Sequence, residues 1–426
     1  MRAAVTGLGK IGGDGVELAL LAAFEGAALP ERRALVEALG KIGGAASHEF
    51  LKGASSDDPE LERRRTRALL MLERSATRDL SATIDIDRPL PSPATLVLAC
   101  RRGLAWVLLD EARARGDFRA PSGHEVVTTW SGALRPLLEL RTALSVGFEA
   151  KLQSPGDDGI VAALTGLAPL LAAVSSGVPR FRLSWPKGHQ RARSFRIAEG
   201  LDPTRLINDP RAAPFEAQID EPNRRVVVVV RPDDELRFSY RGRDVPAASH
   251  PTIAASLARV AGVRADDVVW DPFVGSGLEL CERGLLGPFA KLIGTDTSDD
   301  ALRAARENAS RAGLSVDLIR GDATGHTPSG VTLIITNPPM GRRIARDSDV
   351  ANLLDRFIDS ASPRLAAGGR LVWLSPFPEK TAQKLATHGL EVERHAPVDL
   401  GGFDAELQVA TRRFTSPQAG TKIPPR

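Results

Sequence analysis

Two short motifs bring together residue types that can do chemistry. One is Asp271–Gly277, which reads Asp-Pro-Phe-Val-Gly-Ser-Gly, and the other is Asn337–Met340, which reads Asn-Pro-Pro-Met about sixty residues later. Each directly follows a run of apolar, β-prone residues. Clusters of Gly and Pro usually mark turns between a strand and a helix. The order and spacing of these two motifs predict more than turns: a nucleotide-binding loop and a corner that binds an amine.

The nucleotide-binding loop and two carboxylates that follow it in the sequence are the three features that predict a nucleotide pocket. Gly275 and Gly277 allow the backbone to bend tightly and to approach a ligand closely, and no Lys follows Gly277, which excludes a phosphate-binding P-loop. Asp296 comes about twenty residues later, a spacing typical of a carboxylate that binds ribose hydroxyls. Gly321-Asp322-Ala323 offers a further carboxylate for an adenine amine. Together these features predict an adenosine pocket, which a dehydrogenase would share.

The Asn337–Met340 motif distinguishes the chemistry from that of a dehydrogenase. Pro338 and Pro339 fix φ and remove backbone donors, so the Asn337 side-chain oxygen and the Pro338 carbonyl remain as two acceptors. They suit a nucleobase amine, because acceptors outside the ring plane favour a pyramidal nitrogen whose lone pair can attack a sulfonium methyl group. Positioning would supply most of the rate. Neither a metal nor a strong general base is expected.

The elements that position these motifs alternate in type between residues 247 and 414. Apolar runs predict strands at Val268–Trp270, Leu292–Gly294, Val316–Ile319, Thr332–Ile335 and Arg370–Leu374. Between them, helical patterns occur at Thr252–Val260, Gly277–Arg283, Asp299–Ala312, Asp349–Leu365 and Lys380–Thr387. This alternation is typical of a doubly wound parallel sheet. In such a sheet, ligands bind at the carboxyl ends of the strands where the strand order reverses.

Together with its flanking segments, this pattern resembles a known family. Asp271–Gly277, Asp296, Asp322 and Asn337–Pro339 are similar to the motifs of class I amino-methyltransferases that use S-adenosyl-L-methionine (SAM). The wider chain resembles the THUMP-domain branch, which makes N2-methylguanosine in RNA. The wider resemblance spans about residues 94–412, and it depends on Cys100-Arg-Arg-Gly-Leu within Ala94–Gly116, on Ser239-Tyr-Arg, and on His250-Pro-Thr-Ile-Ala-Ala-Ser-Leu.

The resemblance implies that the chain binds SAM and a guanine. The implied cofactor-binding residues are Asp271, Pro272, Phe273, Gly275, Gly277, Asp296, Asp322, Ala323 and Asn337, and the implied catalytic residues are Asn337, Pro338, Pro339 and Met340. The family commonly has Tyr or Phe at the fourth position of the second motif, where the ring stacks on the extruded base. Met340 replaces that ring with a polarisable thioether, and Phe273 is an aromatic residue that could compensate.

Residues 94–245 are predicted to form an α+β region, and the resemblance implies that this region contains a ferredoxin-like segment and a THUMP RNA-binding domain. Strand patterns occur at Thr95–Cys100, Phe181–Trp185 and Val226–Val230, and a helical pattern occurs at Leu104–Arg115. Basic and aromatic residues alternate between Pro179 and Ile197 without an acidic residue. The candidate RNA-binding residues are Arg180, Arg182, Lys187, Arg191, Arg193 and Arg196, with Arg342 and Arg343 beyond the second motif. Alternatively, these charges belong to solvated helix faces or loops.

The first 78 residues contain a repeat. Leu8–Gly13, which reads Leu-Gly-Lys-Ile-Gly-Gly, recurs at Leu39–Gly44, and a weaker third copy has Glu73-Arg74 in place of the Gly pair. Each copy predicts a helix, a Gly-rich break and a second helix, so residues 1–78 resemble short HEAT-like repeats. A coincidental pair of amphipathic helices is the alternative. Such repeats are expected to bind an unidentified protein. Residues 415–426, rich in Pro, Gly and Lys, are expected to be disordered.

The length and composition of the chain limit the class of protein to which it can belong. The chain has 426 residues, too many for one ordinary core, and 56 basic residues nearly balance 53 acidic ones. Its apolar runs are far shorter than the roughly 18 residues of a membrane span, and its N-terminal sequence lacks a secretory pattern. We therefore expect a cytoplasmic protein without a membrane partner. Two cysteines, Cys100 and Cys281, exclude a disulfide framework and a typical zinc site.

The sequence thus predicts a multidomain chain with helical repeats, an α+β region and a Rossmann-like class I methyltransferase domain. Its expected activity is transfer of a methyl group from SAM to N2 of a guanosine in RNA, with tRNA favoured over 23S ribosomal RNA. The second motif would also suit adenine in DNA or glutamine in a protein. A scaffold with a degenerate SAM fold is the alternative that is not an enzyme.

Overall fold

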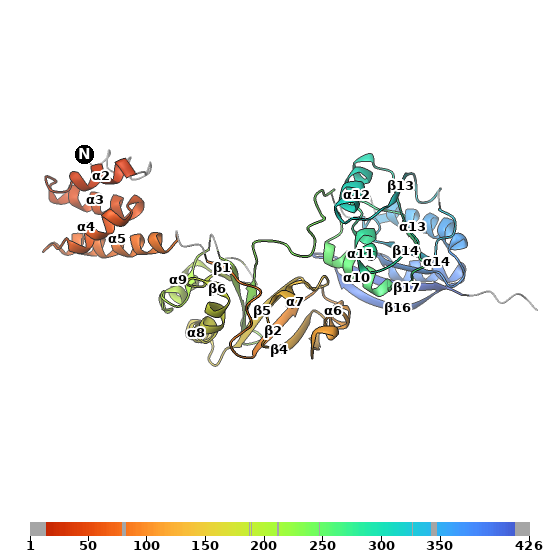
Figure 1. Cartoon of the computed structure of the whole chain (residues 1–426), viewed down its shortest axis with the longest axis horizontal. Helices are drawn as coiled ribbons and strands as arrows, with labels where there is room; N and C mark the ends of the chain where they lie inside the picture. Colours follow the sequence, from red (N-terminus) through yellow and green to blue (C-terminus); the bar gives the residue numbers. More distant parts are fainter. Residues whose placement is uncertain are drawn as a thin grey trace, which may run out of the picture. The chain divides into compact units, whose positions relative to one another are not determined.

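The computed structural model describes residues 14–78, 82–186, 188, 190–210, 213–246, 248–325, 327–341 and 347–413. The chain divides into two compact units, Met1–Thr83 and Ile84–Arg426. Figure 1 shows helices in the first unit and a mixture of helices and strands in the second. The first repeat motif, Leu8–Gly13, and the tail expected to be disordered, 415–426, lie outside the described residues.

The described part of the first unit contains α2 (Asp14–Ala22), α3 (Leu29–Ile42), α4 (Ala45–Gly53) and α5 (Pro59–Arg78). The second repeat copy is confirmed as helix, break and helix, because α3 ends at Ile42 and α4 begins directly after Gly43-Gly44. The prediction is wrong for the third copy. There α5 continues through Glu73-Arg74, since neither residue has the backbone freedom of glycine.

The helices of the first unit share one apolar core, in which Leu35, Leu39 and Leu51 are buried. α3 and α5 approach each other closely at Gly40, where an added Cβ would lie 2.7 Å from the Cβ of Ala68. A side chain at this position would push the two helices apart. Close helix packing therefore explains one glycine of the repeat motif.

The second unit begins with an eight-stranded sheet of order β3-β4-β2-β5-β10-β9-β7-β8. Its strands are β2 (Ala94–Ala99), β3 (Arg119–Ser122), β4 (Glu125–Trp130), β5 (Ser145–Lys151), β7 (Arg180–Ser184), β8 (Ile207–Asn208), β9 (Phe215–Asp220) and β10 (Arg225–Val230). The short strands β1 (Thr83–Ile84) and β6 (Ser175–Ser176) pair separately. The helices are α6 (Ala105–Ala112), α7 (Arg135–Leu138), α8 (Gly156–Ala173) and α9 (Arg191–Glu199). The predicted α+β class is confirmed, although the helix predicted to reach Arg115 ends at Ala112 and continues as a 3-10 turn.

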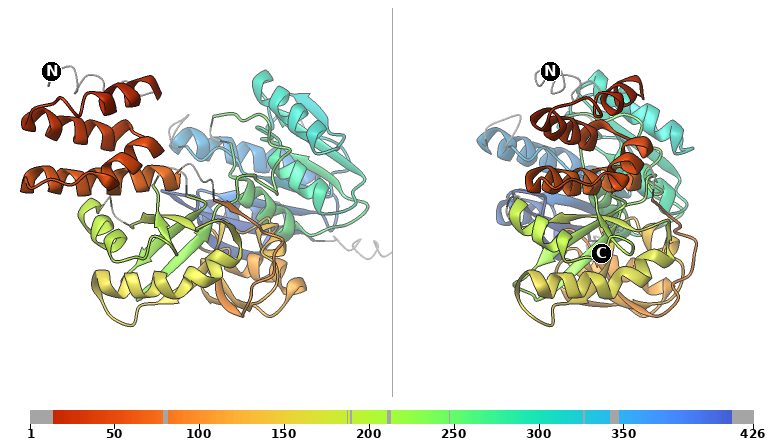
Figure 2. Two further views of the ribbon diagram at one scale, coloured as in Figure 1. Left: turned by 60° about the vertical axis from the view of Figure 1, so that its left-hand side comes forward. Right: turned by 90° about the vertical axis from the view of Figure 1, so that its left-hand side faces the viewer.

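Judged by its length and composition alone, α8 of this middle region could cross a membrane. Ile160, Leu164 and Leu171 on α8 are fully buried in the core of the middle region. Figure 2 shows α8 alongside the strands of that region. Packing in the core therefore accounts for the apolar residues on the buried face of this helix.

The C-terminal part of the second unit is a seven-stranded sheet of order β13-β12-β11-β14-β15-β17-β16. Its five parallel strands are β11 (Val268–Asp271), β12 (Lys291–Asp296), β13 (Asp317–Arg320), β14 (Leu333–Thr336) and β15 (Arg370–Ser375). Its helices are α10 (Pro251–Ala261), α11 (Leu278–Leu286), α12 (Asp299–Arg311), α13 (Asp347–Ala361) and α14 (Pro378–Thr387). The predicted alternation of strands and helices is confirmed, with bounds that differ by a few residues.

The sheet also contains two antiparallel strands that the sequence did not reveal, β16 (Leu390–Asp399) and β17 (Asp404–Arg412). β17 pairs with β15, and β16 forms the edge of the sheet beyond β17. β16 carries charges at Glu391, Glu393 and Arg394, so it lacks the apolar run that identifies a buried strand. The prediction of a parallel sheet is therefore wrong at this edge.

Helices cover both faces of this sheet. Val269 of β11 packs with residues of α10, α11 and α12, whereas its neighbour Trp270 packs with residues of α13 and α14. Leu333 and Ile334 of β14 divide in the same way, because successive side chains of a strand point to opposite faces. The apolar runs of the central strands thus reflect burial on both faces.

The middle region packs directly on the C-terminal part of the same unit. Leu104 and Val107 belong to the same buried cluster as Ile253 of α10. At Gly103, φ is +94° and an added Cβ would lie 1.8 Å from the carbonyl oxygen of Pro397 in β16. Glycine is therefore required where the segment between β2 and α6 contacts β16.

Candidate active site

The candidate site lies at the carboxyl edge of the C-terminal sheet. β11 has β12 on one side and β14 on the other, so the strand order reverses at β11. The segments that leave these three strands therefore meet at one edge of the sheet, the position where ligands bind in open parallel sheets. These segments contain most of the predicted cofactor and substrate residues.

The loop after β11 bends as predicted. Gly275 and Gly277 adopt φ values of +50° and +81°, in the left-handed region that favours glycine, and Gly277 is the N-cap of α11. The carboxylate of Asp296 accepts a hydrogen bond from the Gly275 backbone nitrogen at 3.0 Å. An added Cβ on Gly277 would lie 3.1 Å from Ala305 of α12. The first glycine thus lets the loop turn beside Asp296, and the second lets α11 pack on α12.

Asp271 ends β11 in a fully buried position. Its Oδ1 accepts hydrogen bonds from the Thr336 hydroxyl at 2.6 Å and from the Phe273 backbone nitrogen at 3.1 Å. Its Oδ2 is also buried and has no hydrogen-bond partner among the described residues. Burial, together with the nearby Glu279 carboxylate, raises the pKa of Asp271 well above its ordinary value. The Oδ2 atom is therefore a candidate acceptor for a bound ligand.

Two further carboxylates lie where the sequence predicts the ribose and adenine contacts. Asp296 at the end of β12 is half-buried, and its Oδ1 accepts a hydrogen bond from the Ser298 backbone nitrogen at 2.9 Å. Asp322 follows β13, is exposed, and accepts from the Thr324 backbone nitrogen at 2.8 Å. That hydrogen bond lowers the pKa of Asp322, so its carboxyl group is ionised at neutral pH. Ala323 is buried beside it.

The second motif places Asn337 beside a hydrogen-bonded chain that the sequence did not reveal. The Asn337 Nδ2 donates to the Ser249 hydroxyl oxygen at 2.9 Å, and that hydroxyl donates to the buried Glu279 carboxylate. The Asn337 Oδ1 is buried, and no group in the described part of the chain donates a hydrogen bond to it. Pro338, the next residue, is buried. The amide oxygen is thus an unused acceptor at the end of β14, as the amine-binding hypothesis requires.

The two residues considered for stacking on a base lie in apolar packing. Met340 is half-buried against the cluster that contains Leu104. The Phe273 ring lies 5.4 Å from the Phe357 ring in an edge-to-face contact and packs on the α13 side of the sheet. Phe273 is half-buried against the cluster that contains Phe357, so its use as a replacement for the missing aromatic ring of the second motif stays a prediction.

The basic stretch 179–197 is largely neutralised by acidic residues from other parts of the middle region. Arg180 is 2% exposed and pairs with Asp209 at 2.7 Å, so its prediction as an RNA-binding residue is wrong. Arg182 pairs with the buried Glu216 of β9. Folding brings these acids next to the arginines, which a count of charges along the sequence cannot show.

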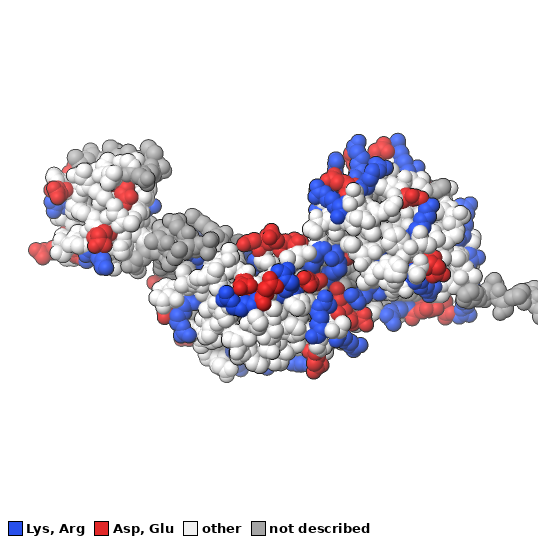
Figure 3. Space-filling view, in the orientation of Figure 1, with Lys and Arg blue, Asp and Glu red and all other residues white. Residues whose placement is uncertain are grey.

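Arg193 and Arg196 are also paired, although both remain at least partly exposed. Arg193 contacts Asp157 at 2.7 Å and Glu221 at 2.9 Å, and Arg196 shares Asp157 at 2.8 Å. Figure 3 shows charges of both signs mixed over the visible face of the middle region. Among the remaining candidates, Arg191 is exposed, and Lys187, Arg342 and Arg343 lie outside the described residues.

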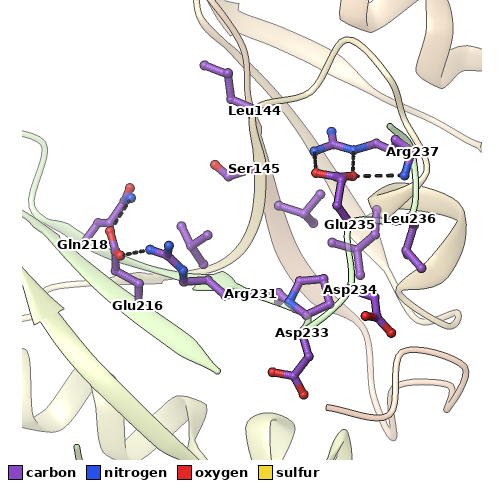
Figure 4. A pocket seen from close by; sticks show the side chains of 15 residues that line it. Leu144, Ser145, Glu216, Gln218, Arg231, Asp233, Asp234, Glu235, Leu236 and Arg237 are labelled. Atoms are coloured by element: carbon purple, nitrogen blue, oxygen red, sulfur yellow. Dashed lines mark hydrogen bonds and ion pairs between the residues drawn. The ribbon is translucent and has the colours of Figure 1, made fainter. Parts of the chain in front are cut away.

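A cavity of about 430 Å³ lies in the middle region, between residues of β5, β9 and β10 and the loop 231–237. Several of its polar side chains are paired with each other, and Figure 4 shows Arg231 with Glu216 and Arg237 with Glu235. Gln218 also donates to Glu216, at 3.2 Å. None of the residues that line the cavity belongs to the two motifs. We therefore place the chemistry at the edge of the C-terminal sheet.

The residues at that edge fit a cofactor that carries hydroxyl and amino donors. Gly275 leaves its backbone open, since an added Cβ would have no neighbouring atom closer than 3.9 Å. Asp296 and Asp322 present carboxylate oxygens to the same edge. Asp271 adds a buried oxygen that no described group satisfies. Such acceptors suit the ribose hydroxyls, the adenine amine and the ammonium group of SAM.

Comparisons with known proteins support the methyltransferase-like fold of this part of the chain. Residues 239–403 match the family model described as RMKL-like, methyltransferase domain. The crystal structure of TrmN from Thermus thermophilus matches with a TM-score of 0.60 at 24% identity, over 75% of this chain and 99% of that chain. The C-terminal part of the second unit has the fold of a class I methyltransferase. The predicted Rossmann-like class is therefore confirmed.

Two curated relatives are similar over part of the chain. The tRNA (guanine(10)-N2)-dimethyltransferase of Methanothermobacter thermautotrophicus is 33% identical over 157 residues, which cover 36% of this chain and 46% of the relative. The tRNA (guanine(6)-N2)-methyltransferase of Methanocaldococcus jannaschii is 26% identical over 261 residues, which cover 51% of this chain and 66% of the relative. The chain thus spans roughly half to two thirds of the length of these relatives.

Proposed function

We propose that the protein is a SAM-dependent methyltransferase that methylates N2 of a guanosine in RNA, with tRNA as the favoured substrate. One observation carries the proposal: the Asn337 Oδ1 is a buried acceptor without a partner in the described chain, directly after β14. The Pro338 carbonyl is a second acceptor next to it in sequence. The named activities of the relatives, guanine-N2 methylation of tRNA, support guanosine in tRNA over adenine or glutamine.

The cofactor is held by residues that follow β11, β12 and β13. The backbone of Gly275 and Gly277 allows close approach, Asp296 accepts from the ribose hydroxyls, and Asp322 accepts from the adenine amine. Asp271 offers its unsatisfied oxygen to the polar end of the cofactor. When bound, SAM supplies an electrophilic sulfonium methyl group.

Asn337 and Pro338 orient the amine that receives the methyl group. Each of the two oxygens accepts one N–H of the guanine amino group, which favours a pyramidal nitrogen with an available lone pair. The same oxygens stabilise the positive charge that develops on the nitrogen. The methylated nitrogen is acidic, so its proton passes to water and no charged base is assigned. Positioning of the amine thus supplies most of the catalysis.

The middle region is proposed to bind the rest of the RNA as a ferredoxin-like and THUMP region, because an extruded guanine requires a surface that holds the flanking nucleotides. Arg191, Arg193 and Arg196 are its candidate phosphate contacts, although Asp157 reduces the net charge of the last two. The helical first unit is proposed to be HEAT-like and to bind a protein. A cytoplasmic location stays a prediction.

The proposal is tested with the full chain, tritiated SAM and separate pools of tRNA, ribosomal RNA, DNA and protein. We expect label in tRNA, and nucleoside mass spectrometry should identify N2-methylguanosine. Label in ribosomal RNA alone would change the RNA and keep the reaction. Labelled adenine in DNA or labelled glutamine in protein would replace the proposal. Calorimetry that detects no SAM binding would favour a scaffold with a degenerate fold.

A further inference from the structure

A chain of three side chains connects α11 to the amide of Asn337. Glu279 lies in the first turn of α11 and is 4% exposed. Its carboxylate accepts the hydroxyl hydrogen of Ser249, a residue shortly before α10, and the Ser249 oxygen accepts a hydrogen bond from the Asn337 Nδ2 at 2.9 Å. Three segments that are distant in sequence therefore meet at one amide group.

The direction of these hydrogen bonds determines which way the amide faces. A carboxylate only accepts hydrogen bonds, so Ser249 gives its single hydroxyl hydrogen to Glu279. The Ser249 oxygen can then only accept, which requires the nitrogen of Asn337 opposite it. A flipped amide would set its oxygen against the Ser249 oxygen with no hydrogen between them. The Oδ1 acceptor has no partner among the described residues in either form, but flipping also removes the Ser249 partner of the Nδ2 donor. An additional unsatisfied buried donor lowers the population of the flipped form by roughly 5- to 150-fold.

We propose that Ser249 and Glu279 are positioning residues that hold the Asn337 amide with its oxygen turned toward the substrate amine. This inference rests on the proposed function, because it assigns the pair to the same site. It also accounts for the burial of a carboxylate whose side-chain donor, among the residues that the structure describes, is a hydroxyl group and not a cation. Both residues act through Asn337, so neither has to touch the cofactor or the RNA.

The orientation of the amide depends on the charge of Glu279. Burial raises the pKa of Glu279, and Glu282 on the same helix adds to the rise, whereas the Ser249 hydrogen bond opposes it. The carboxyl group of Asp271 in β11 also interacts with Glu279. A protonated Glu279 can donate to Ser249, which frees the Ser249 hydrogen to face the amide oxygen. Turnover should therefore fall as the pH drops through this raised pKa.

The test compares Ser249→Ala and Glu279→Gln with two matched controls at exposed positions, Ser310→Ala and Glu393→Gln. All variants are assayed as full chains, by single-turnover methylation of RNA and by calorimetric binding of SAM. We expect both site variants to lower turnover by about ten-fold or more, while the Kd for SAM changes by less than about two-fold. The controls should match the wild-type protein in both measurements.

Two further measurements separate positioning from a purely structural role. The acid limb of the wild-type pH profile should disappear in Glu279→Gln, because glutamine gains no proton in that range. Ser249→Thr should keep most of the turnover, since it retains the hydroxyl group. Thermal melts identify a variant that fails to fold. If Glu279→Gln fails to fold, the result for Ser249→Ala tests the positioning role, because this substitution removes one oxygen atom and leaves Glu279 in place.

The possible outcomes distinguish this inference from the proposed function. A wild-type protein that methylates RNA, together with site variants of equal activity, would overturn the positioning role and leave the proposed function intact. Equal losses of turnover and SAM affinity would assign the pair to cofactor binding, which also overturns it. A wild-type protein that binds SAM and methylates no RNA would refute the proposed function itself.

Discussion

Replacing Asp271 by asparagine should make the protein more stable and less able to bind its cofactor. The carboxyl group is fully buried, and within the described chain only its Oδ1 is hydrogen-bonded, to Thr336 and Phe273. Asparagine keeps the Oδ1 acceptor and replaces the unsatisfied Oδ2 with an amide NH2 group near the Glu279 carboxylate. An unsatisfied buried polar group costs about 1–3 kcal/mol. The free energy of unfolding should therefore rise by a similar amount at pH values above the raised pKa of Asp271.

The gain in stability should depend on pH in a defined direction. The folded-state pKa of Asp271 is raised above the ordinary value of 3.8, so the folded protein binds the proton more tightly than the unfolded chain does. Wild-type protein then loses stability as the pH rises from 3.8 through the raised value, a loss that the asparagine variant does not have. The two proteins should be closest in stability near pH 3.8 and furthest apart above the raised pKa.

Urea unfolding of the full chain at several pH values measures this difference, and calorimetry measures the affinity for SAM. Asp266→Asn is the matched control, because the Asp266 side chain is exposed, and it should change neither quantity. A variant that is less stable than wild type at every pH would refute the reasoning, because it would show that both oxygens of Asp271 are satisfied in the folded chain.

Three other substitutions test separate parts of the structure. Asn337→Ala should lower single-turnover methylation by roughly 10²- to 10³-fold, with SAM affinity nearly unchanged in calorimetry. Asp267→Ala should lower the free energy of unfolding by about 3–5 kcal/mol in urea titrations, because buried Arg283 and Arg370 lose their shared carboxylate. Burial acts to raise the pKa of Asp267, but its ion pairs lower it to about 2, so in wild type this stabilisation should be lost as the pH falls from 3.8 through about 2. Gly103→Ala should lower the melting temperature, since its methyl group would overlap a carbonyl of β16.

The parallel core of the sheet could be predicted because its strands are buried on both faces. Val268–Trp270 and Thr332–Ile335 are short apolar runs, each followed by a motif rich in Gly or Pro. The pairing of β11 with β14 could not be predicted, because strand order depends on contacts between segments about sixty residues apart. That pairing is what sets Thr336 beside Asp271. Sequence identifies the chemical groups here, and the strand order decides which of them meet.

The basic stretch shows the limit of counting charges along a sequence. Arg180 lies in β7 and faces the interior, where Asp209 neutralises it. Arg193 lies on α9 and pairs with Asp157 of α8, on another helix. Both acids are more than twenty-five residues away from their partners, so no local window contains the pair. By contrast, Glu279 is an acidic residue in the first turn of the mostly buried α11. An acidic residue in an otherwise buried helix was the sequence signal that could have indicated the hydrogen-bonded side chains Glu279, Ser249 and Asn337.

The charges at the sheet edge also bear on which cofactor it can hold. A dinucleotide would bring its pyrophosphate to the loop after β11, beside the buried carboxyl group of Asp271 and without a nearby Lys in the motif. The sulfonium and ammonium groups of SAM carry the opposite charge. A cation bound there would favour the ionised Asp271 carboxylate and lower its raised pKa, which offsets part of the free-energy cost of burying it. Asp271 therefore disfavours a dehydrogenase cofactor for the same electrostatic reason that it favours SAM.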